Sequence, residues 1–326
     1  MLFEVLCGLV VFKLFRRLFS GGDADGDSFL DADCNRSDAL FSVASRLEKI
    51  YGGKSYVGLR IPDPDTGSRQ HIEIVLVTKK EVIVVAVRSF SGFVEVGKDG
   101  SWVCAKDKKR TETLPDPVIE ITRQVEILES YLEQRGVPLP KGYLIGRVVL
   151  PNPDCRTAPS IDFQTEVISF EKWTELKSEP KTGFSNWIKD AFQGGKGEMQ
   201  DGLYQRLNLI LSTAPMWDRL EVKDKNLLGE FVEFKGNQED VQELRNLKRS
   251  KVGQFIIQKS SLFGAFGRSR VRILYVPRDY RSEGTSSFEW KEVSVKPATE
   301  FVFHPLNSKK TRKFKVSSVT SLTLSV

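Results

Sequence analysis

The pattern of apolar and polar residues marks residues 71–92 as the centre of a folded domain. The run at residues 82–87 is continuously apolar and mostly β-branched, which favours a buried strand and is too short to indicate a helix. A second strand is expected at residues 72–77, and the four polar residues between the two runs fit a hairpin turn. Two charged side chains interrupt this apolar frame, since Glu73 lies inside the first strand and Arg88 directly follows the second. An unpaired charge is costly to bury, so both side chains need partners.

Helices are expected on either side of this hairpin along the chain. Residues 37–51 and 117–135 carry apolar residues that recur on one helical face. Further strands are expected at residues 56–61, 93–96, 101–105, 143–150 and 166–169. Mixed strands and helices of this kind predict an α/β domain over residues 37–177.

The pattern changes in the second half of the chain. Residues 178–202 are polar and rich in glycine around one amphipathic piece, which is typical of an interdomain linker. Residues 203–211 favour a helix, and from residue 218 onward seven or eight short strands and one helix follow. We therefore expect a β-rich domain at residues 203–326, built as a small barrel or a strongly bent sheet.

The N-terminus is apolar and basic. Residues 1–19 contain an unbroken apolar run that three cations follow, which favours a helix at a membrane interface or a short anchor. An ordinary helix docked on the protein is the alternative. If the segment inserts, the positive-inside rule leaves the body in the cytosol, although the sequence does not name the organelle. Residues 20–36 are acidic and are expected to be a disordered linker.

Charge is distributed unevenly over the 326 residues, whose net charge is +6. Residues 205–326 carry 22 Lys and Arg against 13 Asp and Glu, a balance of +9. Such a half can attract nucleic acid or anionic lipid, and an ordinary solvated surface is the alternative. The candidate nucleic-acid contacts form two basic runs, Lys106, Lys108, Lys109 and Arg110 in one and Lys309, Lys310, Arg312 and Lys313 in the other.

Cysteine and histidine usage argues against a zinc site. The four cysteines are widely scattered without a CxxC pair, and the chain has two histidines. The cysteines are expected to be reduced, which indicates an intracellular protein.

Residues 36–178 resemble the nuclease-related domain family, known as NERD. The β-rich half at residues 203–326 resembles the tail that plant-like members of this family carry. That family is similar to restriction-endonuclease-like enzymes of the PD-(D/E)xK type, whose mixed sheet is flanked by helices. The family pattern is an Asp in one strand, a Thr-containing turn, a strand ending Glu-x-Lys, and a Ser-Gly. The matching positions here are Glu73, Thr78, Ala86-Val87-Arg88 and Ser91-Gly92.

The resemblance implies Mg²⁺ chemistry, in which two carboxylates hold the metal and a lysine orients water. Glu73 can serve as one carboxylate, but Ala86 removes the second. Arg88 keeps a positive charge but cannot replace lysine as a group that releases a proton. Asp65 and Glu120 are the candidates that could complete a metal set with Glu73.

Two readings of this site remain open. In the first, Glu73 and Arg88 form an ion pair left in a degenerate site, and the protein binds or scaffolds at a membrane without a cofactor and without enzymatic activity. In the second, a rebuilt Mg²⁺ site cuts DNA or RNA. A membrane-associated adaptor that binds protein through its β-rich domain is a third possibility.

Overall fold

The computed structural model describes residues 24–107, 110–176, 199, 201–245, 247, 252–259, 271–277 and 290–325. The expected membrane segment at residues 1–19 lies outside these residues, as do Lys108, Lys109 and almost all of the expected linker at 178–202. The existence of that anchor and of that linker therefore stays a prediction. Within the described residues, no helix combines the length and apolar character needed to cross a bilayer.

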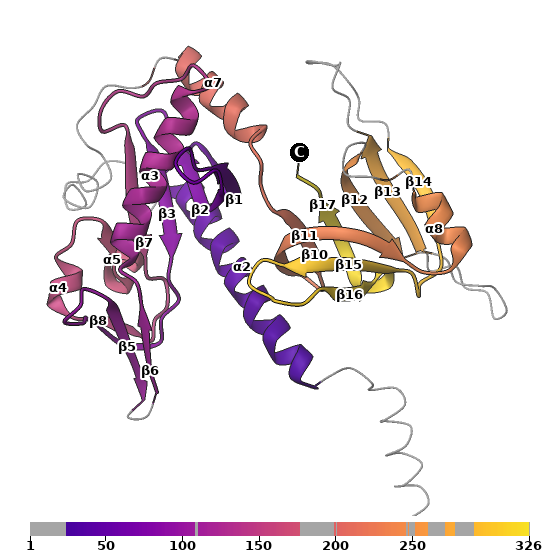
Figure 1. Cartoon of the computed structure of the whole chain (residues 1–326), viewed down its shortest axis with the longest axis horizontal. Coiled ribbons are helices and arrows are strands. Elements are labelled where there is room, and N and C mark those ends of the chain that lie inside the picture. The colour runs from indigo at the N-terminus through magenta and orange to yellow at the C-terminus, as the bar shows by residue number, and fades with distance from the viewer. Residues whose placement is uncertain are drawn as a thin grey trace, which may run out of the picture.

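A five-stranded mixed sheet forms the first half of the molecule (Figure 1). Its strands, in spatial order, are β1 (Lys54–Pro62), β2 (Arg69–Val77), β3 (Val82–Val87), β7 (Leu144–Val149) and β9 (Val167–Ile168). The first three pair antiparallel, whereas β3, β7 and β9 pair parallel. Strand β3 lies in the middle and all six of its residues are buried, which explains its unbroken apolar sequence.

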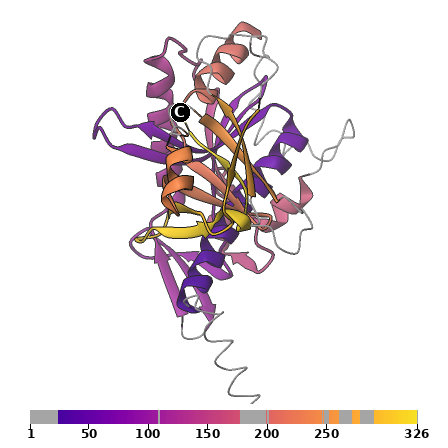
Figure 2. The same cartoon turned by 90° about the vertical axis from the view of Figure 1, so that its right-hand side faces the viewer.

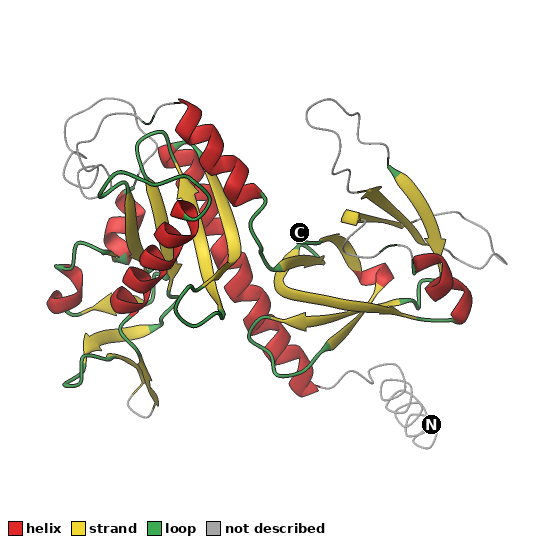
Figure 3. Ribbon diagram, turned by 45° about the horizontal axis from the view of Figure 1, so that its top comes forward, coloured by secondary structure: helices red, strands yellow, loops and turns green. Residues whose placement is uncertain are grey.

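Helices cover both faces of this sheet (Figure 3). The helices are α2 (Ala24–Tyr51) and α5 (Phe170–Glu175) on one face, and α3 (Pro117–Glu133) and α7 (Asp201–Ser212) on the other. Helix α3 begins sharply because Asp116 accepts a hydrogen bond from the Val118 backbone N–H and Pro117 occupies the first turn. The expected helix-flanked mixed sheet is confirmed.

A smaller sheet continues from the end of β3. Its order is β6 (Arg110–Leu114), β5 (Trp102–Asp107), β4 (Gly92–Val96) and β8 (Cys155–Thr157), and the short helix α4 (Pro159–Asp162) follows. Gly92 adopts a φ of +118° and its α-carbon faces the Ala105 carbonyl, where a Cβ would lie 2.3 Å from that oxygen. The turn after β3 thus requires glycine.

The second half is a curled antiparallel sheet of eight strands that forms a half-barrel, as expected for a bent sheet. Its strands, in spatial order, are β14 (Lys291–Val295), β13 (Val271–Pro277), β12 (Val252–Lys259), β17 (Val319–Thr323), β10 (Asp218–Val222), β11 (Lys225–Lys235), β15 (Glu300–Pro305) and β16 (Arg312–Lys315). Helix α8 (Gln238–Leu244) and the 3-10 turn η1 (Val316–Ser318) complete it. Figure 2 views the molecule from the side of this β-rich domain.

Helix α2 packs against both halves, and it runs between the two sheets in Figures 1 and 3. Cys34 lies in the core of the β-rich domain, whereas Leu40 and Leu47 lie in the core beneath the mixed sheet. The expected helix at residues 37–51 is therefore longer, and residues 24–36, which we expected to be a disordered linker, are helical. Burial of Cys34 in a second core supplies the packing that the acidic sequence does not indicate.

Helix α7 packs on the other side of the domain boundary from the one that the sequence indicated. Its Leu207 and Leu211 are fully buried in the core that α3 and the mixed sheet share. Residues 203–211 therefore pack with the first half of the molecule, although we grouped them with the β-rich half. The strand pattern begins only at Asp218, and composition alone does not show on which side of the boundary the helix packs.

Candidate functional site

Glu73 is the buried centre of the candidate site. It lies on β2, and its side chain is 4% exposed. Its Oε2 accepts a hydrogen bond of 2.6 Å from the Val87 backbone N–H at the end of β3. Its Oε1 lies 3.1 Å from Arg88 Nη1 and 3.2 Å from Arg36 Nη2. Two guanidinium groups and one backbone N–H thus surround this carboxylate, as a buried charge requires.

Arg88 links Glu73 to a second carboxylate. Its Nη2 donates a hydrogen bond of 2.7 Å to Oε2 of Glu120, which stands near the start of α3. Burial by itself would lower the pKa of Arg88, but Glu73 and Glu120 together outweigh burial and raise that pKa. Arg88 is therefore a permanent cation between two carboxylates and cannot act as a proton donor or acceptor near neutral pH.

Ala86 stands where the expected second carboxylate is missing. The antiparallel ladder of β2 and β3 ends at the pair Ile74↔Val85, and Glu73 and Ala86 are the next residues beyond that pair. The Ala86 side chain is fully buried in the core beneath α3. The structure thus brings Glu73 and Arg88 into contact at the end of β3, the strand that carries Ala86. The catalytic role that the family pattern gives to these positions stays a prediction.

Asp65 belongs to a different network from Glu73 and Glu120. It lies in the loop after β1, and its carboxylate forms an ion pair with Arg123 of α3. Arg123 also lies 3.1 Å from the buried carboxylate of Asp63. The metal set that we expected from Glu73, Asp65 and Glu120 therefore does not form one carboxylate cluster, and each of the three carboxylates pairs with an arginine. Among the residues that the structure describes, no three His, Cys, Asp or Glu side chains gather as metal ligands.

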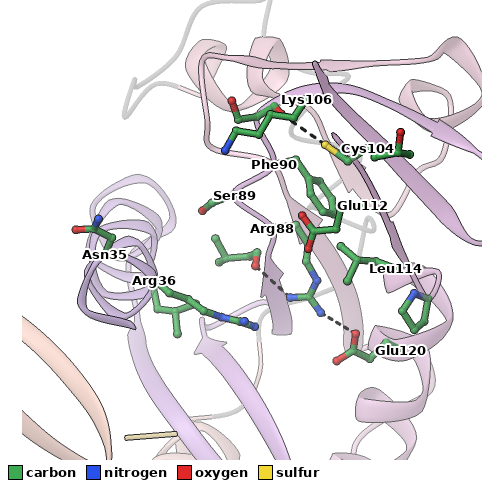
Figure 4. A pocket seen from close by; sticks show the side chains of 15 residues that line it. Asn35, Arg36, Arg88, Ser89, Phe90, Cys104, Lys106, Glu112, Leu114 and Glu120 are labelled. Carbon is green, nitrogen blue, oxygen red and sulfur yellow. Dashed lines mark hydrogen bonds and ion pairs between the residues drawn. The ribbon is translucent and has the colours of Figure 1, made fainter. Parts of the chain in front are cut away.

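A cavity of about 910 Å³ opens beside Arg88 (Figure 4). Arg36 of α2 and Lys106 of β5 line it together with Glu112 of β6 and Glu120 of α3. Of the first basic run, Lys106 thus faces the candidate site. The second run, Lys309, Lys310, Arg312 and Lys313, lies on the β-rich domain, in the turn before β16 and on that strand.

Arg36 is the site residue that sequence analysis missed. We assigned residues 20–36 to a linker, whereas the structure puts Arg36 on α2 and against Glu73. Helical spacing offers a signal, since Arg36 precedes the apolar positions Leu40 and Val43 by four and seven residues on the same helical face.

The structure is a helix-flanked α/β domain joined to a β-rich domain, with a buried ion-pair network at the end of β3. Residues 37–151, about a third of the chain, match the family model of the nuclease-related domain, NERD. Placement in the PD-(D/E)xK superfamily is consistent with that domain. No curated protein and no solved structure matches the chain.

Proposed function

We propose that this protein is a nuclease-related module that binds its ligand without cutting it and works at a membrane surface. The observation that carries the proposal is the environment of Glu73, whose carboxylate already accepts from Arg36, Val87 and Arg88. A catalytic carboxylate in this fold has to offer its oxygens to a metal. Here the guanidinium groups of Arg36 and Arg88 contact the carboxylate where a metal ion would bind.

The residues at the strand end do not fit Mg²⁺. The ion requires near-octahedral coordination by hard oxygen ligands. Ala86 contributes no oxygen, and Arg88 separates the carboxylates of Glu73 and Glu120 with a positive charge. A divalent cation at Glu73 would need to displace Arg36 or Arg88 from its ion pair, and release of the largely buried Arg88 would leave a poorly compensated charge.

A nuclease assay tests this proposal. Wild type, Glu73→Ala and the double variant Ala86→Glu/Arg88→Lys are incubated with single- and double-stranded DNA and RNA in Mg²⁺ or Mn²⁺. We expect wild type to leave every substrate intact. Cleavage by wild type that disappears in Glu73→Ala would refute the proposal and establish a metal-dependent nuclease. Cleavage by the double variant alone would show that two substitutions account for the loss.

The membrane part of the proposal rests on residues 1–19. Their apolar run and the three cations that follow suit insertion at the lipid headgroups with the body in the cytosol. We expect full-length protein to sediment with membranes, and a variant without residues 1–20 to remain in the supernatant at physiological salt. Equal partitioning of both proteins into the supernatant would contradict a role for this segment.

The basic second half supports weak binding to polyanions. Lys309 and Lys310 are exposed in the turn before β16, and Lys313 is exposed on that strand. Counterion release predicts that affinity for nucleic acid or anionic vesicles falls steeply as salt rises. Replacing Lys309, Lys310 and Lys313 with Gln should weaken binding at low salt and flatten its salt dependence. Unchanged binding by this variant would place the contact elsewhere.

A further inference from the structure

We propose that the cavity beside Arg88 binds a phosphate monoester group, held by Arg36 and Lys106. This inference names a ligand class for the proposed function. It rests on that function in one respect, since it assumes that the protein releases the ligand without cutting it. The proposal concerns the wall formed by α2 and the β5–β6 hairpin, and it assigns no metal to the site.

The cavity has the size and construction of a ligand site. Its volume of about 910 Å³ lies within the range of small-molecule pockets, about 300–1,000 Å³. Four elements build it: α2, the segment after β3, the β5–β6 hairpin and the start of α3. Figure 4 shows Arg36 on α2 and Lys106 on the hairpin strand, with the Arg88 guanidinium between Arg36 and Glu120.

Arg36 has hydrogen-bonding capacity left for a ligand. One of its terminal nitrogens, Nη2, donates to Glu73 at 3.2 Å. Its side chain is 52% exposed, and its Nη1 and Nε groups donate to no other described residue. Guanidinium groups bind phosphate oxygens in a planar, two-pronged geometry, so the free edge of Arg36 can hold an anion while Nη2 keeps its contact with Glu73.

Lys106 supplies the second cation. It is exposed on the cavity wall and makes no ion pair with any side chain that the structure describes. The ladder between β5 and β6 shifts register between Ala105 and Asp107, so Lys106 lies at a bulge. Bulges re-aim a side chain relative to a regular strand, and here the affected side chain faces the cavity.

Two carboxylates also face the cavity, and they differ in their effect. Glu120 is neutralised by Arg88 at 2.7 Å. Glu112 has no cationic partner among the described residues and raises the pKa of the neighbouring Cys104, in addition to the larger effect of burial. Its charge repels an anion, so Glu112 lowers the affinity of the cavity for a phosphate group.

The hydroxyl groups favour a monoester over a diester. Ser89, Ser91 and Thr111 line the cavity, and none of the three hydroxyls bonds to another described residue. A phosphate monoester carries about 1.5 to 2 negative charges at neutral pH and presents three terminal oxygens. Two cations and three hydroxyl donors match such a group better than the single charge and two free oxygens of a diester.

The test uses the full chain and glycerol phosphate as the probe, with binding followed by calorimetry at low salt. We expect Arg36→Met and Lys106→Met each to weaken binding by about tenfold or more, since each removes a charge-assisted contact. Glu112→Gln should tighten binding severalfold. Dimethyl phosphate, a diester, should bind at least about tenfold more weakly than glycerol phosphate.

Lys98→Met is the matched control, because Lys98 is exposed in the turn between β4 and β5 and does not line the cavity. Its affinity for the probe should equal that of wild type. Lys106→Met, Glu112→Gln and Lys98→Met must first show the thermal midpoint of wild type, whereas Arg36→Met should lose some stability because Arg36 also pairs with Glu73. No binding by wild type, or wild-type affinity in both Lys106→Met and Glu112→Gln, would overturn the proposal whatever the nuclease assay shows.

The same chemistry can come from a soluble metabolite or from a lipid headgroup, and two further arms separate these sources. Full-length protein is mixed with phosphatidylcholine vesicles that contain or lack phosphatidic acid, whose headgroup is a phosphate monoester. If the headgroup is the ligand, binding to phosphatidic acid falls in Lys106→Met. If Lys106→Met changes binding of soluble glycerol phosphate alone, the ligand is a soluble phosphomonoester. Both results support the cavity.

Discussion

At the scale of single residues, the candidate site is a chain of alternating charges. Arg36, Glu73, Arg88 and Glu120 contact one another in that order, and the two inner members are the most buried. A buried ion pair adds little net stability compared with an apolar pair, but removal of one partner is costly. The network therefore fixes the geometry of the strand end more than it stabilises the fold.

Glu73→Gln tests this network. The substitution keeps the shape of the side chain but removes the charge that two arginines share. We expect the free energy of unfolding to fall by about 3 kcal/mol, because Arg88 is left buried without full compensation. Urea unfolding measures the change. The double variant Glu73→Gln/Arg88→Met should recover part of the loss, and a purely additive double variant would contradict coupling of the two side chains.

His71 gives the fold a dependence on pH. Burial is the main cause that lowers its pKa below the ordinary value of 6.5, while Glu73 acts in the opposite direction. Its Nδ1 accepts a hydrogen bond of 3.1 Å from the Trp217 indole N–H. A protonated imidazole carries a hydrogen on Nδ1 and cannot accept that bond.

The sign of the effect follows from proton uptake. Below 6.5 the unfolded chain binds a proton at His71 that the folded chain still excludes, so stability is full above this pH and declines below it. His71→Asn keeps an acceptor but does not titrate. Between about pH 7 and pH 5, urea midpoints of wild type should fall more steeply than those of His71→Asn. Parallel curves would show that His71 does not contribute.

At the scale of elements, α2 holds β11 through side chains rather than through a strand ladder. Asp38 Oδ1 accepts hydrogen bonds of 2.8 Å from both the backbone N–H and the side-chain amide of Asn226. Ser37 Oγ accepts from the Leu228 backbone N–H at 3.3 Å. These contacts lie one and two residues after Arg36, so they also position the wall of the cavity.

Asp38→Ala should cost about 1–3 kcal/mol in the free energy of unfolding, because it leaves two donors of Asn226 without this acceptor. Asp38→Asn retains an acceptor oxygen and should lose less. Ser45→Ala, at an exposed position on the same helix, should stay within about 0.5 kcal/mol of wild type. Equal stability of all three variants would contradict an anchoring role for Asp38.

The elements also show how far the sequence predicts this structure. The apolar run at β3 and the amphipathic spacing of α3 predicted the central strand and its covering helix, because both signals arise from burial in one core. The ion pair of Glu73 with Arg88 followed from the cost of an unpaired charge. The role of Arg36 did not, because the acidic composition of residues 20–36 indicated a linker and its partner Glu73 lies 37 residues away. The first turns of α2 did not either, because this helix packs on the β-rich half, where Asp38 and its partner Asn226 are 188 residues apart.

At the scale of the whole molecule, two cores share one helix. The first half of α2 contributes Cys34 to the β-rich core, and its second half contributes Leu40 and Leu47 to the core beneath the mixed sheet. Further contacts join the halves near β1, where the Arg60 guanidinium lies 4.0 Å from the centre of the Trp217 ring. The match to the nuclease-related domain begins at residue 37, inside this shared helix.

A chain that begins at residue 37, where the family match begins, should therefore be less stable than the full chain. Loss of residues 24–36 removes Cys34 from the β-rich core and Arg36 from Glu73. We expect the midpoint of thermal unfolding to fall by about 5–10 °C, which corresponds to a few kcal/mol for a protein of this size.

A chain without residues 1–20 is the matched control, because it retains the whole of α2. Its midpoint should equal that of the full chain. Hydrogen exchange then locates the loss: amides of β10 and β11 should lose protection in the shorter chain, even though both strands lie far from the deletion in sequence. If both truncated chains unfold at the same temperature with the same protection, each domain folds without the first turns of α2, and the two cores are independent.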